Sequence, residues 1–243
     1  MNERPGLARL TKVELRKMVD TRSGFWLQLA VLGLTVAAVL ITALAGDESG
    51  QTFRHILANG LAPAGILLPV VGILLVSSEW SQRTALVSFA LVPERARLIA
   101  AKVGAGIVLG LIATAFAAVV AAIGTAVASS SVAEVWTFPI GLVGQYLIYV
   151  VTAMVIGVAF GAALQASAPA IVLYFGLPAA LGALESIHAI HGTVEWFSSG
   201  SFEWLTQNVL SGHEWAQVLV ALLLWMVLPL AIGVWRVTQR DLS

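Results

Sequence analysis

The sequence predicts an all-α polytopic membrane protein with six transmembrane helices, organised as one membrane domain over residues 1–243. Hydrophobic residues make up 59% of the chain and charged residues only 11%, whereas soluble domains are about 25% charged. Neither a soluble fold nor a disordered chain accommodates that much apolar surface. Residues 117–123 read AAVVAAI, which is not the alternating pattern of a transmembrane β-barrel. The spans are therefore expected to be helices, which satisfy their own backbone hydrogen bonds in lipid.

Six apolar stretches each reach the roughly 20 residues that a helix needs to cross the hydrocarbon core. They cover residues 26–45, 56–78, 98–128, 138–164, 169–187 and 216–235. The third and fourth are longer than a bilayer requires, so we expect them to tilt or to extend past the headgroups. The first 25 residues are too charged to be a cleavable signal peptide. The absence of cysteine excludes disulfides, Cys-ligated zinc and thiol catalysis.

Lysine and arginine residues set the expected orientation, because they concentrate on the cytoplasmic side of membrane proteins. Twelve of the 13 fall before the first span, around the segment between the second and third spans, or after the sixth, and only Arg54 falls opposite. Six spans put both termini on the same side, so we expect both in the cytoplasm. The expected location is the plasma membrane, which is the inner membrane in bacteria. Acidic residues occupy the other side: Asp47, Glu48, Glu134, Glu195, Glu203 and Glu214.

The N-terminal region, residues 1–25, is expected to form an amphipathic helix over residues 7–21 along the membrane interface. Glu14 falls on the apolar side of this helix, so we expect it to have a protein partner. Thr11 and Glu14 also match a capping box, which offers a later helix start. The alternative role of the segment is a topology signal alone. The basic side chains of the charged face would reach anionic headgroups. The apolar face carries Leu7, Thr11, Leu15 and Met18. The charged face carries Arg9, Lys12, Arg16 and Asp20.

The segment between the second and third spans, residues 79–97, is too apolar for an ordinary solvated loop. Leu86, Phe89 and Leu91 would let a short helix occupy a hydrophobic groove on another protein. Pro93 would end that helix. The alternative is a simple connector between helices. The inner boundary of the third span is marked by basic residues: Arg95, Arg97 and Lys102.

The order of these features resembles the permease subunits of type-2 ABC exporters, a family that includes antibiotic-export and bacitracin-resistance permeases. The likeness covers the whole chain by topology and residues 79–102 by local motif. Arg83 departs from the family pattern, because many relatives have glycine before the threonine. The resemblance implies that the N-terminal helix is the elbow helix and that residues near 81–89 form the coupling helix. Recurrent family positions are matched by Glu79, Thr84, Pro93, Arg95 and Lys102.

The resemblance also implies partners and a set of coupling residues. The partners would be a soluble ABC ATPase subunit and a second permease copy, in a homodimer or a related heterodimer, together with membrane lipid but no nucleic acid. ATP and Mg would bind to the ATPase, so this chain is expected to be non-catalytic and to hold no cofactor. The residues expected to couple to the ATPase are Glu79, Arg83, Thr84, Leu86, Phe89, Pro93 and Arg95.

An argument about the energy source favours the same function. The chain contains no G-x-x-x-x-G-K-[ST] phosphate loop. Ion-coupled carriers need ionisable groups at mid-membrane depth, but Glu79, Lys102 and Glu185 lie toward span ends. This argument favours a permease powered by a separate ATPase subunit. The resemblance implies that the direction is export, and the substrate would be amphipathic, such as a drug, a peptide antibiotic or a lipid. The alternatives are an ion-coupled secondary transporter, a non-transporting scaffold, and an intramembrane hydrolase, for which Ser167 and Ser211 lack a paired histidine.

Small residues and prolines within the spans predict close packing and bends. The motifs Gly106-x-x-x-Gly110 and Gly157-x-x-x-Gly161 allow close helix approach. Each marks either a dimer interface or packing within the chain. Helix kinks are expected at the prolines inside the spans: Pro63, Pro69, Pro178 and Pro229.

The outer segment, residues 188–215, is rich in aromatic residues, which prefer the membrane interface. Trp196, Trp204 and Trp215 are expected to anchor it there. Short interfacial helices are favoured over a free loop. The family resemblance implies a small helical hairpin between spans five and six, which would gate the exit of substrate.

The run Glu185-x-x-His188-x-x-His191-x-x-x-Glu195 permits a metal interpretation, because His and carboxylate side chains bind zinc. It begins at the end of a span and crosses Gly192, and both features argue against a continuous helix. Hydrogen bonding at the interface is therefore favoured, and no metal site is expected.

Overall fold

The computed structural model describes residues 6–45, 51–81, 95–128, 135–185, 194 and 196–239. All regular secondary structure in these residues is helical. Six segments are long and apolar enough to span a membrane, which confirms the all-helical class and the number of candidate spans. The elements are α1 (Leu7–Asp20), α2 (Arg22–Ala45), α3 (Phe53–Ser81), α5 (Arg95–Ala128), α6 (Ile140–Leu164), α7 (Ser167–Glu185), α9 (Ser201–Gln207), α10 (Gly212–Leu222), η1 (Leu223–Val227) and α11 (Leu228–Gln239).

The candidate spans extend beyond the predicted apolar stretches at several ends. Helices α3 and α5 each include three more residues at the end that adjoins the 82–94 segment. The last span, Gly212–Gln239, contains α10, η1 and α11 in succession. A helix satisfies its backbone internally whatever its side chains are, so polar residues continue the helix after the apolar stretch has ended.

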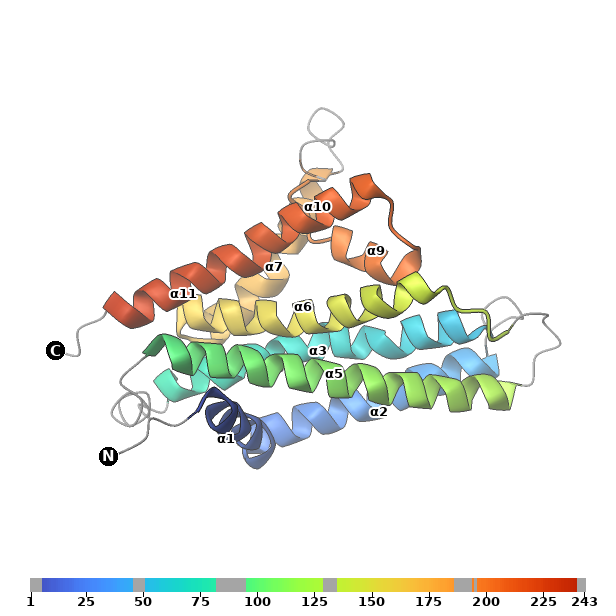
Figure 1. Cartoon of the computed structure of the whole chain (residues 1–243), viewed down its shortest axis with the longest axis horizontal. Coiled ribbons are helices and arrows are strands. Elements are labelled where there is room, and N and C mark those ends of the chain that lie inside the picture. The colour runs from blue at the N-terminus through green and yellow to red at the C-terminus, as the bar shows by residue number, and fades with distance from the viewer. Residues whose placement is uncertain are drawn as a thin grey trace.

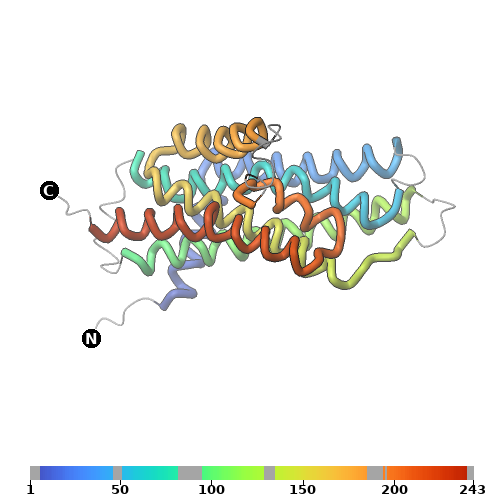
Figure 2. The backbone as a smooth tube through the Cα atoms, turned by 90° about the horizontal axis from the view of Figure 1, so that it is seen from above, coloured from blue at the N-terminus to red at the C-terminus, as the bar shows by residue number. Residues whose placement is uncertain are grey.

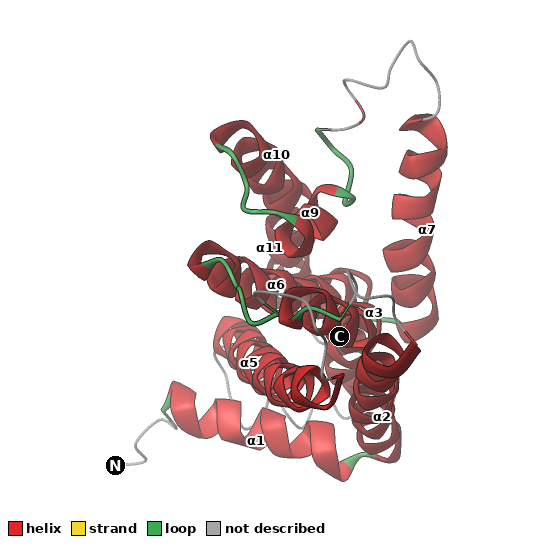
Figure 3. Cartoon of the chain, turned by 90° about the vertical axis from the view of Figure 1, so that its right-hand side faces the viewer, coloured by secondary structure: helices red, strands yellow, loops and turns green. Residues whose placement is uncertain are grey.

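Helices α2, α3, α5 and α6 run side by side along the length of the molecule, and α11 lies against α6 (Figure 1). Helix α1 crosses one end of this bundle at a steep angle, which Figure 3 shows in end view. The C-terminal end of α11 lies at that same end, as do the last turn of α3 and the first turn of α5 (Figures 1 and 2). We call this the terminal end of the bundle.

The centre of the bundle is the crossing of α3 and α6, where glycines bring the two backbones together. A Cβ at Gly157 would overlap the carbonyl oxygen of Pro69, and one at Gly161 would lie 2.8 Å from the carbonyl oxygen of Ile73. Helix α5 presents its glycines to another side of α6, where Gly110 of α5 lies against Val151 of α6. Both small-residue motifs therefore pack within the chain, so neither of them is free to mark a dimer interface.

Helix α7 is the least buried of the candidate spans. Only 6% of its apolar window is buried, against 72% for α6. It contacts α3 and α6 through its first turns, where Ala170 is buried and Ser167 Oγ lies 2.7 Å from Ser77 Oγ. Figure 3 shows the rest of α7 standing apart from α10 and α11. One face of this helix is thus left without a partner in the described chain.

The prolines affect the spans in different ways. Helix α3 continues through Pro63 and Pro69, and α7 continues through Pro178. Pro229 follows the π-helical turn η1, in which the Leu228 N–H donates to the Leu223 carbonyl. Proline removes one backbone donor and crowds the preceding turn. The wider π turn lies just before Pro229, where the regular α-helical hydrogen bonds are interrupted, and the span continues beyond it.

In its described residues, the outer segment contains the short helix α9, which lies on α6. Gln145 of α6 donates to the carbonyls of Leu205 and Asn208 at 3.3 and 2.8 Å and accepts from the Leu210 N–H at 3.2 Å. These bonds satisfy backbone groups that the end of a helix leaves open. Within the described residues α9 is followed by α10, which is the first part of the last span rather than a separate second outer helix.

Candidate functional site

Helix α1 turns a carboxylate toward the bundle in the middle of its buried face. Leu10, Glu14 and Met18 are four residues apart, which places them on one face of the helix. All three are buried. Helix α1 begins at Leu7 after Gly6, so the later start suggested by the capping-box pattern is wrong. The predicted anchoring residues lie on the outer side of this helix and are exposed: Arg9, Lys12 and Arg16.

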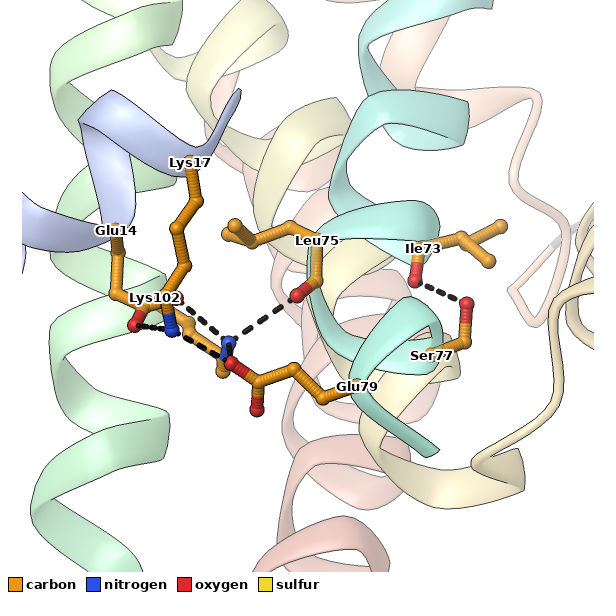
Figure 4. Close-up of polar contacts among 7 residues, drawn as sticks. All are labelled: Glu14, Lys17, Ile73, Leu75, Ser77, Glu79 and Lys102. Atoms are coloured by element: carbon orange, nitrogen blue, oxygen red, sulfur yellow. Dashed lines mark hydrogen bonds and ion pairs between the residues drawn. The ribbon is translucent and has the colours of Figure 1, made fainter. Parts of the chain in front are cut away.

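Glu14 belongs to a cluster of four ionisable side chains from three helices, which we call the charge cluster: Glu14 and Lys17 of α1, Glu79 of α3 and Lys102 of α5 (Figure 4). The Lys102 ammonium lies 2.6 Å from Glu14 Oε2 and 3.0 Å from Glu79 Oε1. The Lys17 ammonium lies 2.7 Å from both Glu14 Oε1 and Glu79 Oε1. The expectation that Glu14 has a protein partner is confirmed, and the partners lie in this chain.

The burial of Lys102 requires complete pairing, because an isolated buried ammonium is strongly unfavourable. Lys102 and Glu14 are each only 1% exposed. Besides its two carboxylate contacts, Lys102 donates to the Leu75 carbonyl at 3.1 Å. An ammonium has three donors, so all three are used. The two lysines and two glutamates also cancel in formal charge, which reduces the cost of burying Glu14 and Lys102.

Lys17 is the more accessible cation of the charge cluster, with 39% of its side chain exposed. Burial alone would lower the pKa of Lys17, but its hydrogen bonds and charge interactions with Glu14 and Glu79 outweigh burial and raise the pKa above its ordinary value of 10.5. Lys17 therefore stays protonated throughout the physiological pH range. The Glu14–Lys17 spacing of three residues is a common helical ion pair, so the pattern offered a signal for Lys17 that the sequence analysis missed.

The charge cluster fastens α1 to the two helices that border the 82–94 segment. Glu79 lies near the end of α3, and Lys102 lies two turns into α5. Small residues bring α1 close to α5: Ala101 is fully buried beside Leu10, and a Cβ at Gly104 would lie 3.1 Å from Thr11 Oγ1. A displacement of either helix end would therefore be transmitted to α1 through short, charge-assisted contacts.

The residues predicted to couple to an ATPase have different positions in the chain. Glu79 is in the charge cluster, and Arg95, at the start of α5, donates to the Val237 carbonyl of α11 at 2.9 Å. Both thus make contacts between helices of this chain. Lys102, which was predicted to mark the inner boundary of the third span, is a member of the charge cluster. The remaining coupling residues lie outside the described residues: Arg83, Thr84, Leu86, Phe89 and Pro93.

The three predicted aromatic anchors are half-buried at the opposite end of the bundle. Trp204 and Trp215 pack against an apolar cluster that includes the buried Trp225. The Trp196 ring lies 5.3 Å from the His213 ring in an edge-to-face arrangement. Their packing against protein is thereby established, and their contact with the membrane interface stays a prediction.

The groups considered for other chemistry have structural partners or fall outside the described residues. Ser167 shares a hydrogen bond with Ser77, and Ser211 caps α10 together with Glu214. No group of three potential metal ligands occurs among the described residues. The candidate run at the end of α7 is not covered by this finding, because the Glu185 side chain, His188, His191 and Glu195 lie outside the described part.

The fold and its hydropathy define the class of protein. The chain is all-helical, and its six long apolar helices support its classification as a multi-pass membrane protein. A buried charge cluster lies at one end of the bundle. No protein-family model matches the sequence, and a search of curated proteins finds no similar chain.

Proposed function

We propose that this chain is the membrane-spanning permease subunit of an ATP-driven exporter, powered by a separate ATPase that binds the 82–94 segment. The observation that carries the proposal is the charge cluster, which ties α1 to the two helices that lead into and out of this segment. A force applied there would move α1, α3 and α5 together rather than one helix end alone. Coupling to a separate ATPase requires a group of helices that moves as one rigid unit.

The energy source also supports the proposal. The chain has no phosphate loop, and ATP and Mg would belong to the partner subunit. Both termini would lie in the cytoplasm, with a second permease copy completing the transport path. The unpartnered face of α7 is one surface available for that copy. The substrate would be an amphipathic molecule such as a drug, a peptide antibiotic or a lipid.

The experiment isolates the tagged chain in mild detergent from the membrane in which it is natively produced and adds the photoreactive nucleotide 8-azido-ATP. We expect a soluble companion subunit to co-purify, to become labelled and to hydrolyse ATP, while this chain stays unlabelled. Phe89→Asp should remove the companion, because a charge would disrupt an apolar contact. The matched control is Phe197→Asp, which makes the same change at an exposed side chain near the opposite end.

Two results would contradict this function. The coupling assignment fails if Phe89→Asp retains the companion and its ATPase activity as Phe197→Asp does. The exporter itself fails if no nucleotide-binding companion is recovered and the chain alone transports in vesicles.

An ion-coupled carrier is the second candidate, because Glu14 and Lys102 are a buried pair of ionisable groups. Carriers use such groups to bind or relay ions. Two features of the charge cluster weigh against this role: it lies toward one end of α3 and α5, and each of its charges is paired. Uptake driven by a proton or sodium gradient in vesicles that contain only this chain, without nucleotide, would establish the carrier.

A further inference from the structure

A partly enclosed cavity of about 200 Å³ lies between α3, α6, α7, α9 and η1, in the half of the bundle away from the terminal end. Three features of this cavity, which we call the aromatic cleft, determine what it can bind. Its floor is aromatic, it contains one carboxylate, and its volume is below the roughly 300–1,000 Å³ of sites for whole drug-sized ligands. It would therefore enclose a compact group and leave the rest of a larger ligand outside.

The aromatic floor is held in place by its own contacts. The rings of Trp225 and Phe160 stack at a centroid distance of 6.3 Å, and Tyr174 meets Phe160 edge-on at 5.9 Å. Trp225 is 5% exposed, and its indole N–H donates to the Phe197 carbonyl at 2.9 Å. These contacts fix the Trp225 ring in the cleft wall. Aromatic faces carry partial negative charge, which attracts cations.

The electrostatics of the aromatic cleft are one-sided. Glu203 is the one charged residue among the described residues that line it, and these include no lysine, arginine or histidine. Glu203 is exposed, and its carboxylate takes part in none of the ion pairs or hydrogen bonds found among the described residues. The cleft thus offers one carboxylate beside aromatic rings, with no basic residue from the described chain to neutralise it.

Gly65 makes room for the phenol ring of Tyr149, which lines the cleft together with Glu203. A Cβ at Gly65 would overlap the hydroxyl of Tyr149, so an alanine there would displace the ring. Tyr149 and Tyr174 are both only partly buried. Their rings consequently remain available to a molecule in the cleft.

We propose that the aromatic cleft binds the cationic end of an amphiphilic amine or quaternary ammonium compound. The positive group lies beside the Glu203 carboxylate, and the Tyr149, Tyr174 and Trp225 rings surround it through cation–π contacts. The apolar remainder extends toward the open side of the cleft. If the chain is an exporter, cationic amphiphiles are a class of its substrates. This substrate class rests on the proposed function, whereas the binding site does not depend on it.

The test measures binding to the full chain in nanodiscs of neutral phosphatidylcholine, without nucleotide or ATPase, by isothermal titration calorimetry corrected with empty nanodiscs. The probes are benzyltrimethylammonium, its uncharged carbon isostere neopentylbenzene, and the anion phenylmethanesulfonate. We expect the cation to bind at least about fivefold more tightly than the isostere, because cation–π and carboxylate contacts act on the charge alone. The anion should not bind.

Glu203→Gln keeps the size of the side chain and removes its charge at an exposed position, so the fold should be retained. It should weaken cation binding about fivefold and leave binding of neopentylbenzene unchanged. Asp20→Asn, which removes the same charge from the exposed surface of α1, is the matched control and should change neither affinity. Equal affinity for cation and isostere, or unchanged cation binding in Glu203→Gln, would overturn the proposal and leave an apolar site.

The assay separates this proposal from the exporter function. Cation binding in nanodiscs combined with failure to recover an ATPase refutes the exporter and keeps the site. Absent binding combined with intact ATP-driven export refutes the site and keeps the exporter.

Discussion

The charge cluster shows how strongly a single residue constrains this fold. Glu14 and Lys102 are separated by 88 residues in sequence, yet their charged atoms lie 2.6 Å apart in a region closed to water. Breaking a buried pair by removing one partner is far more destabilising than removing both, because the remaining charge loses its compensation. Each member of the charge cluster is therefore needed by the others.

Glu14→Gln should lower the free energy of unfolding by about 3–5 kcal/mol, since Lys102 would stay buried with one carboxylate fewer. The measurement is denaturant unfolding of the chain in detergent, followed by tryptophan fluorescence. Asp20→Asn on the exposed side of the same helix should change it by less than about 0.5 kcal/mol. The double variant Glu14→Gln with Lys102→Met should recover most of the loss. If Glu14→Gln unfolds at the wild-type denaturant concentration, the cluster does not stabilise the fold.

Among the helices, the crossing of α3 and α6 decides the shape of the bundle. These two helices contain the largest buried fractions of all the candidate spans, 67% and 72%. In lipid, helix association depends on close packing because apolar side chains gain little by leaving the hydrocarbon. Gly157 and Gly161 supply that closeness, and they do so against the backbone of α3, which cannot move aside as a flexible side chain can.

Gly157→Ala should destabilise the protein by about 1–3 kcal/mol, because its methyl group would overlap the Pro69 backbone. Gly144→Ala is the control on the same helix, since no atom lies within 4 Å of the position its Cβ would take. This control should be neutral or stabilising by up to about 1 kcal/mol, as alanine favours helix over glycine. Equal shifts of the two variants in thermal unfolding would show that helix propensity, rather than the crossing, determines the effect.

For the molecule as a whole, the two ends of the bundle differ both in their charged residues and in the helices that they contain. The terminal end carries the exposed basic residues of α1 and the partly buried Arg95 and Arg97 at the start of α5. The opposite end carries α9 and the half-buried tryptophans (Figure 1). By the positive-inside rule, we expect the terminal end to face the cytoplasm. The same orientation would place the 82–94 segment within reach of a cytoplasmic ATPase and the aromatic cleft in the outer half of the membrane.

Orientation can be measured directly, because the natural chain has no cysteine. We expect Gly6→Cys and Gln239→Cys, at exposed positions of the terminal end, to react with a membrane-impermeant maleimide only in inside-out vesicles. Val209→Cys, at an exposed position beside α9, should react in intact cells. Reaction of Gly6→Cys and Val209→Cys from the same side would contradict the predicted six-span topology.

The sequence was sufficient for those features that depend on local pattern. Apolar stretches of span length predicted the six long helices, and helical spacing predicted the amphipathic character of α1 with Arg9, Lys12 and Arg16 exposed. It also predicted that Glu14 requires a protein partner. The partner's identity did not follow, because a pairing across 88 residues leaves no local periodicity. The small-residue motifs likewise predicted close packing without indicating which helix approaches.

The amino-acid pattern by itself determined that this chain is helical, apolar enough for a membrane, and asymmetric in its basic residues, because hydropathy and helical periodicity are properties of neighbouring residues. Only the tertiary structure decided that Lys102 is buried in an ion-pair cluster, that both small-residue motifs pack within the chain, and that Glu203 shares a cleft with Trp225. These are contacts between distant segments, and they depend on how whole helices cross, a three-dimensional choice made by the packing of all side chains together.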